Sequence, residues 1–162
     1  MRVVVLADTH IRDGSTSGLG AAAWEHVRAA DVILHAGDVV GAAFLEELRS
    51  VAPVHAVLGN NDAALAGQLP ETLVVDLDGV PVAMVHDSGP RAGREARMQR
   101  RFPGARVVVF GHSHVPWNRP GLGGQLLLNP GSPTQRRAQP HRTLGLLEIG
   151  PGGVQAEIAV VD

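Results

Sequence analysis

The chain has 162 residues, a length that suits a single domain, over residues 1–162, with one contiguous core. Hydrophobic residues make up 44% and charged residues 19%, which excludes an intrinsically disordered protein. The net charge of -2 favours no class of partner, and the absence of cysteine excludes disulfides and thiolate metal sites. We find no secretory signal and no apolar run of about 20 residues, so we expect a cytoplasmic protein without a membrane partner.

The first half of the chain predicts alternating strands and helices. Apolar, β-branched runs at residues 2–7, 31–37 and 53–59 are short enough to be buried strands. Segments rich in Ala and Leu, at residues 20–30 and 42–50, favour helices between them. This β-α-β-α-β order indicates a parallel sheet with right-handed connections.

The second half is richer in strands. Residues 71–86 predict a hairpin that turns at Asp78-Gly79, residues 91–102 a helix and residues 105–111 a strand. Short strands between Gly and Pro turns then dominate, around residues 125–129, 142–150 and 154–161. We predict one α/β domain in which two sheets pack face to face, with helices outside.

Five of the predicted strands end in side chains that are able to bind a metal ion. Because the carboxyl ends of parallel strands meet at one edge of a sheet, we expect these side chains to converge. They are two carboxylates, one amide and four imidazoles: Asp8, His10, Asp38, Asn60, His86, His112 and His114.

Seven nitrogen and oxygen ligands are too many for one ion that keeps a position open for substrate. They suit two ions, provided that one carboxylate bridges them, and Asp38 has two oxygens with which to do so. Such a mixed donor set suits Mn, Fe, Ni, Co or Zn better than Ca or Mg. Two-metal sites serve in-line displacement at phosphorus, so the pattern indicates phosphoester chemistry.

The combined motif resembles that of the calcineurin-like metallophosphoesterase superfamily, and especially its small bacterial and archaeal phosphodiesterases. The signature of the superfamily runs D-x-H, G-D, G-N-x-[D/E], a lone His, and G-H-x-H. The matching segments are Asp8-Thr9-His10, Gly37-Asp38, Gly59-Asn60-Asn61-Asp62, His86 and Gly111-His112-Ser113-His114. An NPGS segment at residues 129–132 is also typical of this branch.

The resemblance implies a four-layer αββα sandwich of two mixed β-sheets with flanking helices and a dimetal site at one edge. It implies that one ion is held by Asp8, His10, Asp38 and His114. It implies that the other ion is held by Asp38, Asn60, His86 and His112. We expect two divalent ions, Mn²⁺ in the first place, with Fe, Ni, Co or Zn as alternatives.

The implied activity is hydrolysis of small phosphodiesters by in-line attack of a metal-bridging hydroxide. Asp38, Asn60 and Asn61 are the expected catalytic residues, and the two asparagines would also bind the phosphate of the substrate. The resemblance also implies a homodimer or a higher homo-oligomer. The loop after the last predicted metal ligand offers further candidates for phosphate contacts, namely Ser132, Arg136, Arg137 and Arg142.

The chain departs from the family pattern at two places. Many members have His where this chain has Asn61, and an amide cannot donate a proton to a leaving group. We therefore expect substrates with poor leaving groups to react slowly. After His86 the pattern predicts Gly-His, and the chain has Asp87-Ser88 instead.

Two alternatives remain open. Some proteins of this fold, such as a subunit of the retromer coat, are protein-binding scaffolds, although those tend to lose metal ligands. A nuclease would need an arginine-rich helix to face the site. We interpret those arginines as a solvated helix face rather than as a patch that binds nucleic acid; they are Arg91, Arg94, Arg97, Arg100 and Arg101.

Two further histidines lie inside apolar runs. We expect His35 and His55 to be hydrogen-bonded residues of the core rather than ligands.

Overall fold

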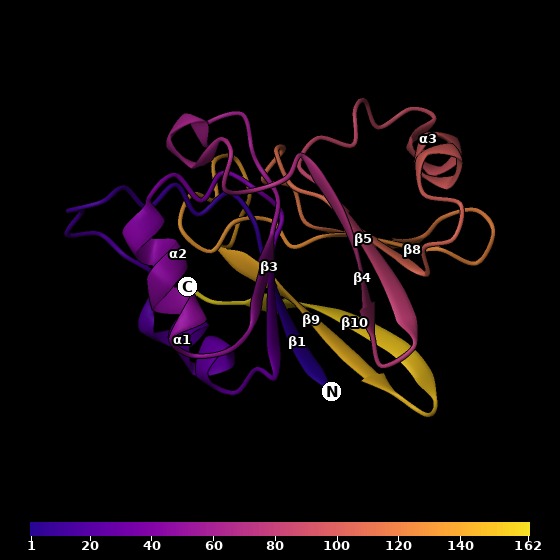
Figure 1. Ribbon diagram of the computed structural model, residues 1–162, viewed down its shortest axis with the longest axis horizontal. Helices are drawn as coiled ribbons and strands as arrows, with labels where there is room; N and C mark the ends of the chain where they lie inside the picture. Colours follow the sequence, from indigo (N-terminus) through magenta and orange to yellow (C-terminus); the bar gives the residue numbers. More distant parts are fainter.

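The computed structural model describes residues 1–162 as two five-stranded mixed sheets with helices on their outer sides (Figure 1). In the first sheet the strand order is β10-β9-β1-β2-β3. Its strands are β1 (Arg2–Leu6), β2 (Val32–His35), β3 (Val54–Ala56), β9 (Thr143–Gly150) and β10 (Gly153–Val160). Strands β1, β2 and β3 are parallel, and β9 runs antiparallel to both of its neighbours, β1 and β10.

In the second sheet the strand order is β4-β5-β6-β8-β7. Its strands are β4 (Thr72–Leu77), β5 (Val80–Val85), β6 (Val107–Val109), β7 (Trp117–Pro120) and β8 (Leu126–Asn129). Strands β5, β6 and β8 are parallel, and β4 and β7 are antiparallel edges. The β4–β5 hairpin turns at Asp78 and Gly79, whose φ angles of 50° and 80° suit a tight primed turn.

Three apolar clusters divide the molecule into four layers. One lies between the sheets and joins Val5 of β1 and Leu34 of β2 to Met84 of β5 and Val109 of β6. A second packs α1 (Ala21–Arg28) and α2 (Ala42–Arg49) on the outer face of the first sheet. A third packs α3 (Arg94–Arg101) on the second sheet. The prediction of an αββα sandwich is confirmed.

The registers of the parallel strands set where the chain leaves each sheet. Leu6 of β1 pairs with His35 of β2, and His35 pairs with Ala56 of β3. In the second sheet, Met84 of β5 pairs with Val109 of β6. The loops that follow these strands therefore emerge at the same end, and these loops carry the candidate ligands.

The structure differs from the sequence predictions in the elements of the second half. Strand β7 was not predicted, because its sequence WNRP lacks an apolar alternation and ends in Pro. Helix α3 begins at Arg94 rather than at Arg91, because Gly93 precedes it with a φ of 70° in the left-handed region. A short 3₁₀ helix, Ala63–Leu65, was also not predicted.

Two predictions about side-chain burial are wrong. His55 is half-buried on the edge strand β3, not a core residue, whereas His35 is fully buried as predicted and bonds Thr9 Oγ1 at 2.9 Å. The arginines of α3 are not all solvated, because Arg94 is only 8% exposed. Its guanidinium lies 4.9 Å from the ring centres of Phe110 and Trp117. None of the helices is long and apolar enough to cross a membrane.

Candidate metal centre

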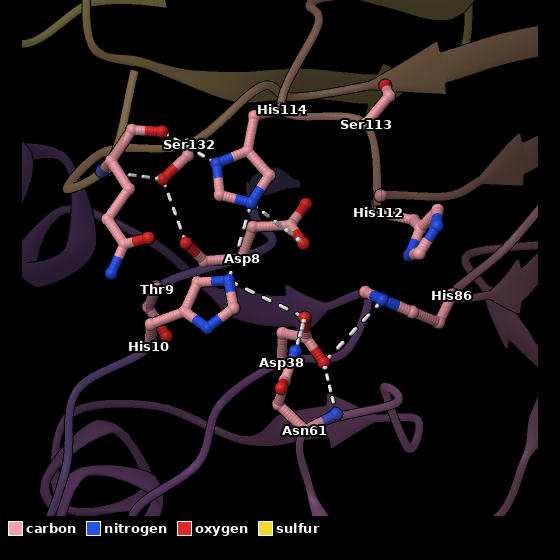
Figure 2. A network of polar contacts seen from close by, with 12 residues as sticks. Asp8, Thr9, His10, Asp38, Asn61, His86, His112, Ser113, His114 and Ser132 are labelled. Atoms are coloured by element: carbon pink, nitrogen blue, oxygen red, sulfur yellow. Dashed lines mark hydrogen bonds and ion pairs between the residues drawn. The ribbon is translucent and has the colours of Figure 1, made fainter. Parts of the chain in front are cut away.

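The structure brings the seven candidate ligands together at the strand ends, and Figure 2 labels all of them except Asn60. Five of these residues have φ angles between 48° and 70°, in the left-handed region that non-glycine residues rarely occupy: Asp8, His10, Asp38, His112 and His114. Such a conformation costs about 1–3 kcal/mol per residue, and residues that adopt it cluster at functional sites. Each turn aims a side chain from the end of its strand or strand loop towards a shared centre.

On one side of the centre, three side chains meet around His10. Its Nε2 atom lies 3.3 Å from Nε2 of His114 and 3.5 Å from Oδ2 of Asp38. His114 Nε2 lies in turn 3.5 Å from Oδ1 of Asp8. These donors come from the loops after β1, β2 and β6, in both sheets.

On the other side, two histidines meet at Asn60. Its Oδ1 lies 2.9 Å from His86 Nε2 and 3.0 Å from His112 Nδ1. His86 Nε2 is 3.6 Å from the Oδ1 atom of Asp38. Asp38 thus faces the His10 side with one oxygen and the His86 side with the other, and Figure 2 shows it between the two histidines.

Asp8 tests whether a metal ion fits this arrangement. Its carboxylate is fully buried, and neither oxygen has a hydrogen-bond partner. Burial, and then the charge of Asp38, raise the pKa of Asp8 to about 8. A buried carboxylate without partners is costly, and a bound cation would remove that cost. The centre therefore fits a divalent ion.

Two groups of side chains could each hold a metal ion, because within each group the ligand atoms all lie within 4.8 Å of one another. One group is Asp8, His10 and His114, and the other is Asp8, Asp38 and His86. Asp8 belongs to both groups, whereas the sequence analysis assigned it to one ion only. Burial alone would raise the pKa of Asp38, but hydrogen bonds from the backbone and side-chain amides of Asn61 hold it below its usual value.

The backbone fixes which imidazole nitrogens face the centre. Nδ1 of His86 lies 2.7 Å from the carbonyl of Ala36, and Nδ1 of His114 lies 2.6 Å from the carbonyl of Gln135. A carbonyl only accepts, so each Nδ1 carries a proton, and in the neutral form of the ring the Nε2 lone pair is then left for a metal. Burial also lowers the pKa values of His10 and His114, which favours the neutral form that a metal requires.

Two glycines allow this close approach. A Cβ on Gly37, which has a φ of 91°, would lie 2.6 Å from His86 Nδ1. A Cβ on Gly59 would collide with the carboxylate and the backbone nitrogen of Asp38. In the sequence these glycines appear only as members of the G-D and G-N motifs, and the structure shows that they make room for the ligand residues.

The structure gives Asp62 a role that the sequence analysis did not assign. Its carboxylate is 1% exposed and accepts three backbone N–H groups, from Asp38 at 2.9 Å, Val40 at 2.7 Å and Gly59 at 2.7 Å. Asp62 therefore ties the loops after β2 and β3 together. Its position as the acidic residue of the G-N-x-[D/E] motif was the only signal of this role.

The NPGS segment also holds the backbone of the centre through hydrogen bonds. Asn129 Nδ2 donates to the carbonyl of Gly111 at 2.9 Å, and Ser132 Oγ donates to the carbonyl of Asp8 at 2.8 Å. The prediction that Ser132 reaches substrate is wrong, because its side chain is buried and 1% exposed. Asn129 and Ser132 instead hold the backbone of two ligand-bearing turns.

The remaining predicted residues have other partners. Asn61 Nδ2 donates to Oδ2 of Asp38 at 2.7 Å, so this amide contacts the carboxylate that faces both sides of the centre. Asp87 Oδ1 accepts from the backbone of Gly89 at 2.7 Å. Arg136 and Arg142 donate to backbone carbonyls of their own loop, and Arg137 is exposed.

Two open cavities of about 430 Å³ each flank the centre. One includes His10, Thr134 and Arg142 in its lining. The other is lined by Leu58, Gly59, Asn60, Glu71, Val85, His86, Asp87, Arg101 and His112. The first cavity thus reaches the centre through His10 alone, and the second reaches it through Asn60, His86 and His112.

The family model of the calcineurin-like phosphoesterase superfamily domain matches residues 1–152. The chain belongs to this superfamily. A "Probable metallophosphoesterase" of Methanothermobacter thermautotrophicus is 36% identical over 162 residues, which cover 98% of this chain and 91% of that protein. A second protein with that description, from Methanocaldococcus jannaschii, is 33% identical over 140 residues, covering 85% of this chain and 70% of its own.

Solved structures of other proteins share the fold. Vps29 of Entamoeba histolytica, in a complex with Zn²⁺, is similar with a TM-score of 0.76 and 24% identity over all of both chains. A structure described as a novel archaeal phosphodiesterase is similar with a TM-score of 0.72 and 18% identity, over 98% of this chain and 100% of its own. At these identities the likeness shows the fold alone.

Proposed function

We propose that this metallophosphoesterase is a phosphodiesterase that requires two divalent metal ions. The observation that carries the proposal is the position of Asp38, whose two oxygens lie 3.5 Å from His10 Nε2 and 3.6 Å from His86 Nε2. The unpartnered oxygens of buried Asp8 support it independently. In this proposal residues 1–162 act as one domain.

The ligand sets of the proposal follow the two sides of the centre. One ion would be held by Asp8, His10, Asp38 and His114. The other would be held by Asp38, Asn60, His86 and His112. Mn²⁺ is the proposed metal, because a mixed set of imidazole, carboxylate and amide donors suits Mn, and also Fe, Ni, Co or Zn.

Two divalent ions in such a site supply a nucleophile at neutral pH and offset the charge that develops at phosphorus. The residues of the chain orient the substrate. Asn60 and Asn61, both exposed at the rim of the centre, would donate amide hydrogens to the phosphate. Asp38 would hold the two sides of the centre at a fixed distance from each other, and Asp62 would fix the backbone of Asp38.

The two cavities favour diesters over monoesters. A phosphodiester carries a substituent on each side of phosphorus, and the centre has a cavity of about 430 Å³ on either side. A monoester would fill only one of them. The substrate in this proposal is therefore a small phosphodiester with a good leaving group.

Hydrolysis of bis(p-nitrophenyl) phosphate tests the proposal. We expect turnover with Mn²⁺ that disappears in excess chelator and in Asp38→Asn, since this change removes a charge shared by both sides. Asp78→Asn is the matched control, because Asp78 lies in the exposed β4–β5 turn and Asn suits its φ of 50°. Absence of turnover with Mn, Fe, Ni, Co and Zn would overturn the proposal.

A protein-binding scaffold is the second candidate, because proteins named Vps29 share the fold. The complete set of seven candidate ligands argues against it. The turnover assay separates the two, because a scaffold would hydrolyse no phosphoester with any of the five metals. Metal content alone would not separate them, since a Vps29 is itself solved in a complex with Zn²⁺. Cytoplasmic location and homo-oligomerisation stay predictions.

A further inference from the structure

The arginines around α3 form a positively charged surface that the proposed hydrolysis does not require. Residues 88–124 contain seven arginines and a single acidic residue, Glu95. Residues 1–87 contain four arginines and twelve acidic residues, so the net charge of -2 conceals a strong asymmetry. Charge asymmetry of this kind is typical of proteins that bind a polyanion.

None of the seven arginines of this segment forms an ion pair. Four of them are exposed and also make no side-chain hydrogen bond, and we call these four the arginine surface: Arg91, Arg100, Arg101 and Arg119. Their guanidinium groups therefore keep all their donors free for a ligand. Arg97, by contrast, is used within the fold, where it donates to the carbonyls of Ser88 and Pro90.

Trp117 holds one end of the arginine surface in place. The guanidinium carbons of Arg91 and Arg119 lie 5.0 and 5.1 Å from the centre of its ring, and buried Arg94 lies 4.9 Å from it. A ring that orders these side chains without neutralising them leaves their charges available. An open cavity of about 580 Å³ lies between Arg91, Arg119 and Trp117.

The other end of the arginine surface reaches the metal centre. Arg101, at the end of α3, lines the same cavity as Asn60, His86 and His112. The eight residues of α3 span about 12 Å between the two ends, at about 1.5 Å per residue. A chain of phosphates could thus lie along α3 with one phosphodiester near the centre.

We propose that the arginine surface binds single-stranded nucleic acid and leads it towards the metal centre. Nucleic acid is favoured over an acidic protein because phosphodiesters are the anions on which the proposed function acts, and this step of the argument rests on that proposed function. A single strand is favoured because a cavity of about 430 Å³ accepts a nucleotide but not a duplex. The proposal concerns binding, and it stands or fails independently of hydrolysis.

The test measures fluorescence anisotropy of labelled 20-nucleotide oligo(dT) and oligo(U) in excess chelator, so that no metal-dependent step contributes. Four phosphate contacts predict a slope of about −3 for log K against log salt concentration, which is about a 50-fold loss of affinity between 50 and 200 mM NaCl. The double variant Arg91→Gln/Arg119→Gln should halve that slope and lower affinity at least about fivefold at 50 mM.

Arg28→Gln is the matched control, because Arg28 is also exposed and also lies over a tryptophan, 5.5 Å from the ring of Trp24 on α1. It should bind like the wild type. Arg100→Gln adds a variant at an exposed arginine that makes no side-chain hydrogen bond and no ion pair, so a weakened affinity there would not come from a lost contact of this kind.

Four results would overturn the proposal. They are no binding at 50 mM NaCl, an equal loss in Arg28→Gln, a double variant with an unchanged slope, and poly-glutamate or a duplex that competes as well as the single strand. The difference between oligo(dT) and oligo(U) would show which nucleic acid is preferred.

Discussion

The carboxylate of Asp62 accepts the backbone N–H of Asp38 at 2.9 Å, and this bond fixes the turn that carries the central carboxylate of the metal centre. The same carboxylate also accepts Gly59 N–H at 2.7 Å, from the loop that carries Asn60. Asp62 is not one of the seven candidate ligands, yet it positions residues from both sides of the centre.

Replacement of Asp62 by Asn should therefore weaken metal binding. The amide has one acceptor oxygen where the carboxylate has two, so its NH₂ group would face a buried N–H. We expect metal affinity to fall about 10- to 100-fold, measured by calorimetric titration with Mn²⁺. The free energy of unfolding of the metal-free protein should fall by about 2–3 kcal/mol.

Asp13→Asn is the control for this experiment. Asp13 Oδ1 accepts the backbone N–H of Ala43 at 2.9 Å near the start of α2, and its side chain bonds none of the candidate ligands. This variant should lose about 1 kcal/mol or less of stability and keep its metal affinity. Unchanged metal affinity in Asp62→Asn would refute the role of Asp62.

Gly59→Ala should displace Asp38 without removing any ligand. The new Cβ would overlap the carboxylate and backbone of Asp38, so one of the two loops must move. We expect a loss of about 1–3 kcal/mol in the free energy of unfolding, from urea denaturation, and a lower Mn²⁺ affinity. Gly104→Ala is the control, because nothing lies within 4 Å of its Cβ position. A Gly59→Ala variant with the Mn²⁺ affinity of the wild type would contradict the close packing of Gly59 against Asp38.

Asn61→His should change the dependence of turnover on the leaving group. Asn61 is exposed beside Asp38, and an imidazole there could donate a proton that an amide cannot. We expect kcat for alkyl phosphodiesters to rise about 100-fold or more, because general acid catalysis contributes about 10²–10⁴-fold. Turnover of p-nitrophenyl esters, whose leaving group needs no proton, should change little. A uniform effect across a series of leaving groups would exclude proton donation.

The layers and the ligand loops could be predicted because local sequence determines them. Apolar runs such as VVVL and VVVF are too short and too β-branched for helices, and their polar ends follow directly in the chain. The order of strands then decides which loops meet at one edge of the sheet. The candidate ligands therefore follow from patterns that lie within a few residues of each strand.

Features that depend on distant partners could not be predicted in this way. Asp62 bonds Asp38 across 24 positions of the sequence, and Arg94 is buried because Phe110 and Trp117 happen to lie beneath α3. The helical spacing of arginines gave no sign of which one faces inward. His55 lies within an apolar run, but its strand is at the edge of the sheet, where only tertiary structure shows the exposure.

His35 provides a test of burial through the pH dependence of stability. Its side chain is fully buried beside Thr9, and burial, together with the charge of His86, lowers its pKa to about 3. The unfolded chain, with an ordinary pKa of about 6.5, binds a proton between pH 6.5 and 3 that the folded protein does not. The free energy of unfolding should therefore fall as pH drops through this range, with His35 contributing up to about 1.4 kcal/mol per pH unit.

His35→Gln removes this contribution and keeps a polar group beside Thr9. The free energy of unfolding of the metal-free proteins can be measured by urea denaturation at pH 4, 5 and 6. Its slope against pH should be smaller in the variant than in the wild type, by about 1.4 kcal/mol per pH unit. Groups that titrate in both proteins cancel in this difference. His55→Gln is the control for the exchange of an imidazole for an amide, because His55 is half-buried and makes no side-chain hydrogen bond. Equal slopes for wild type and His35→Gln would mean that His35 accepts a proton in the folded protein, which its burial forbids.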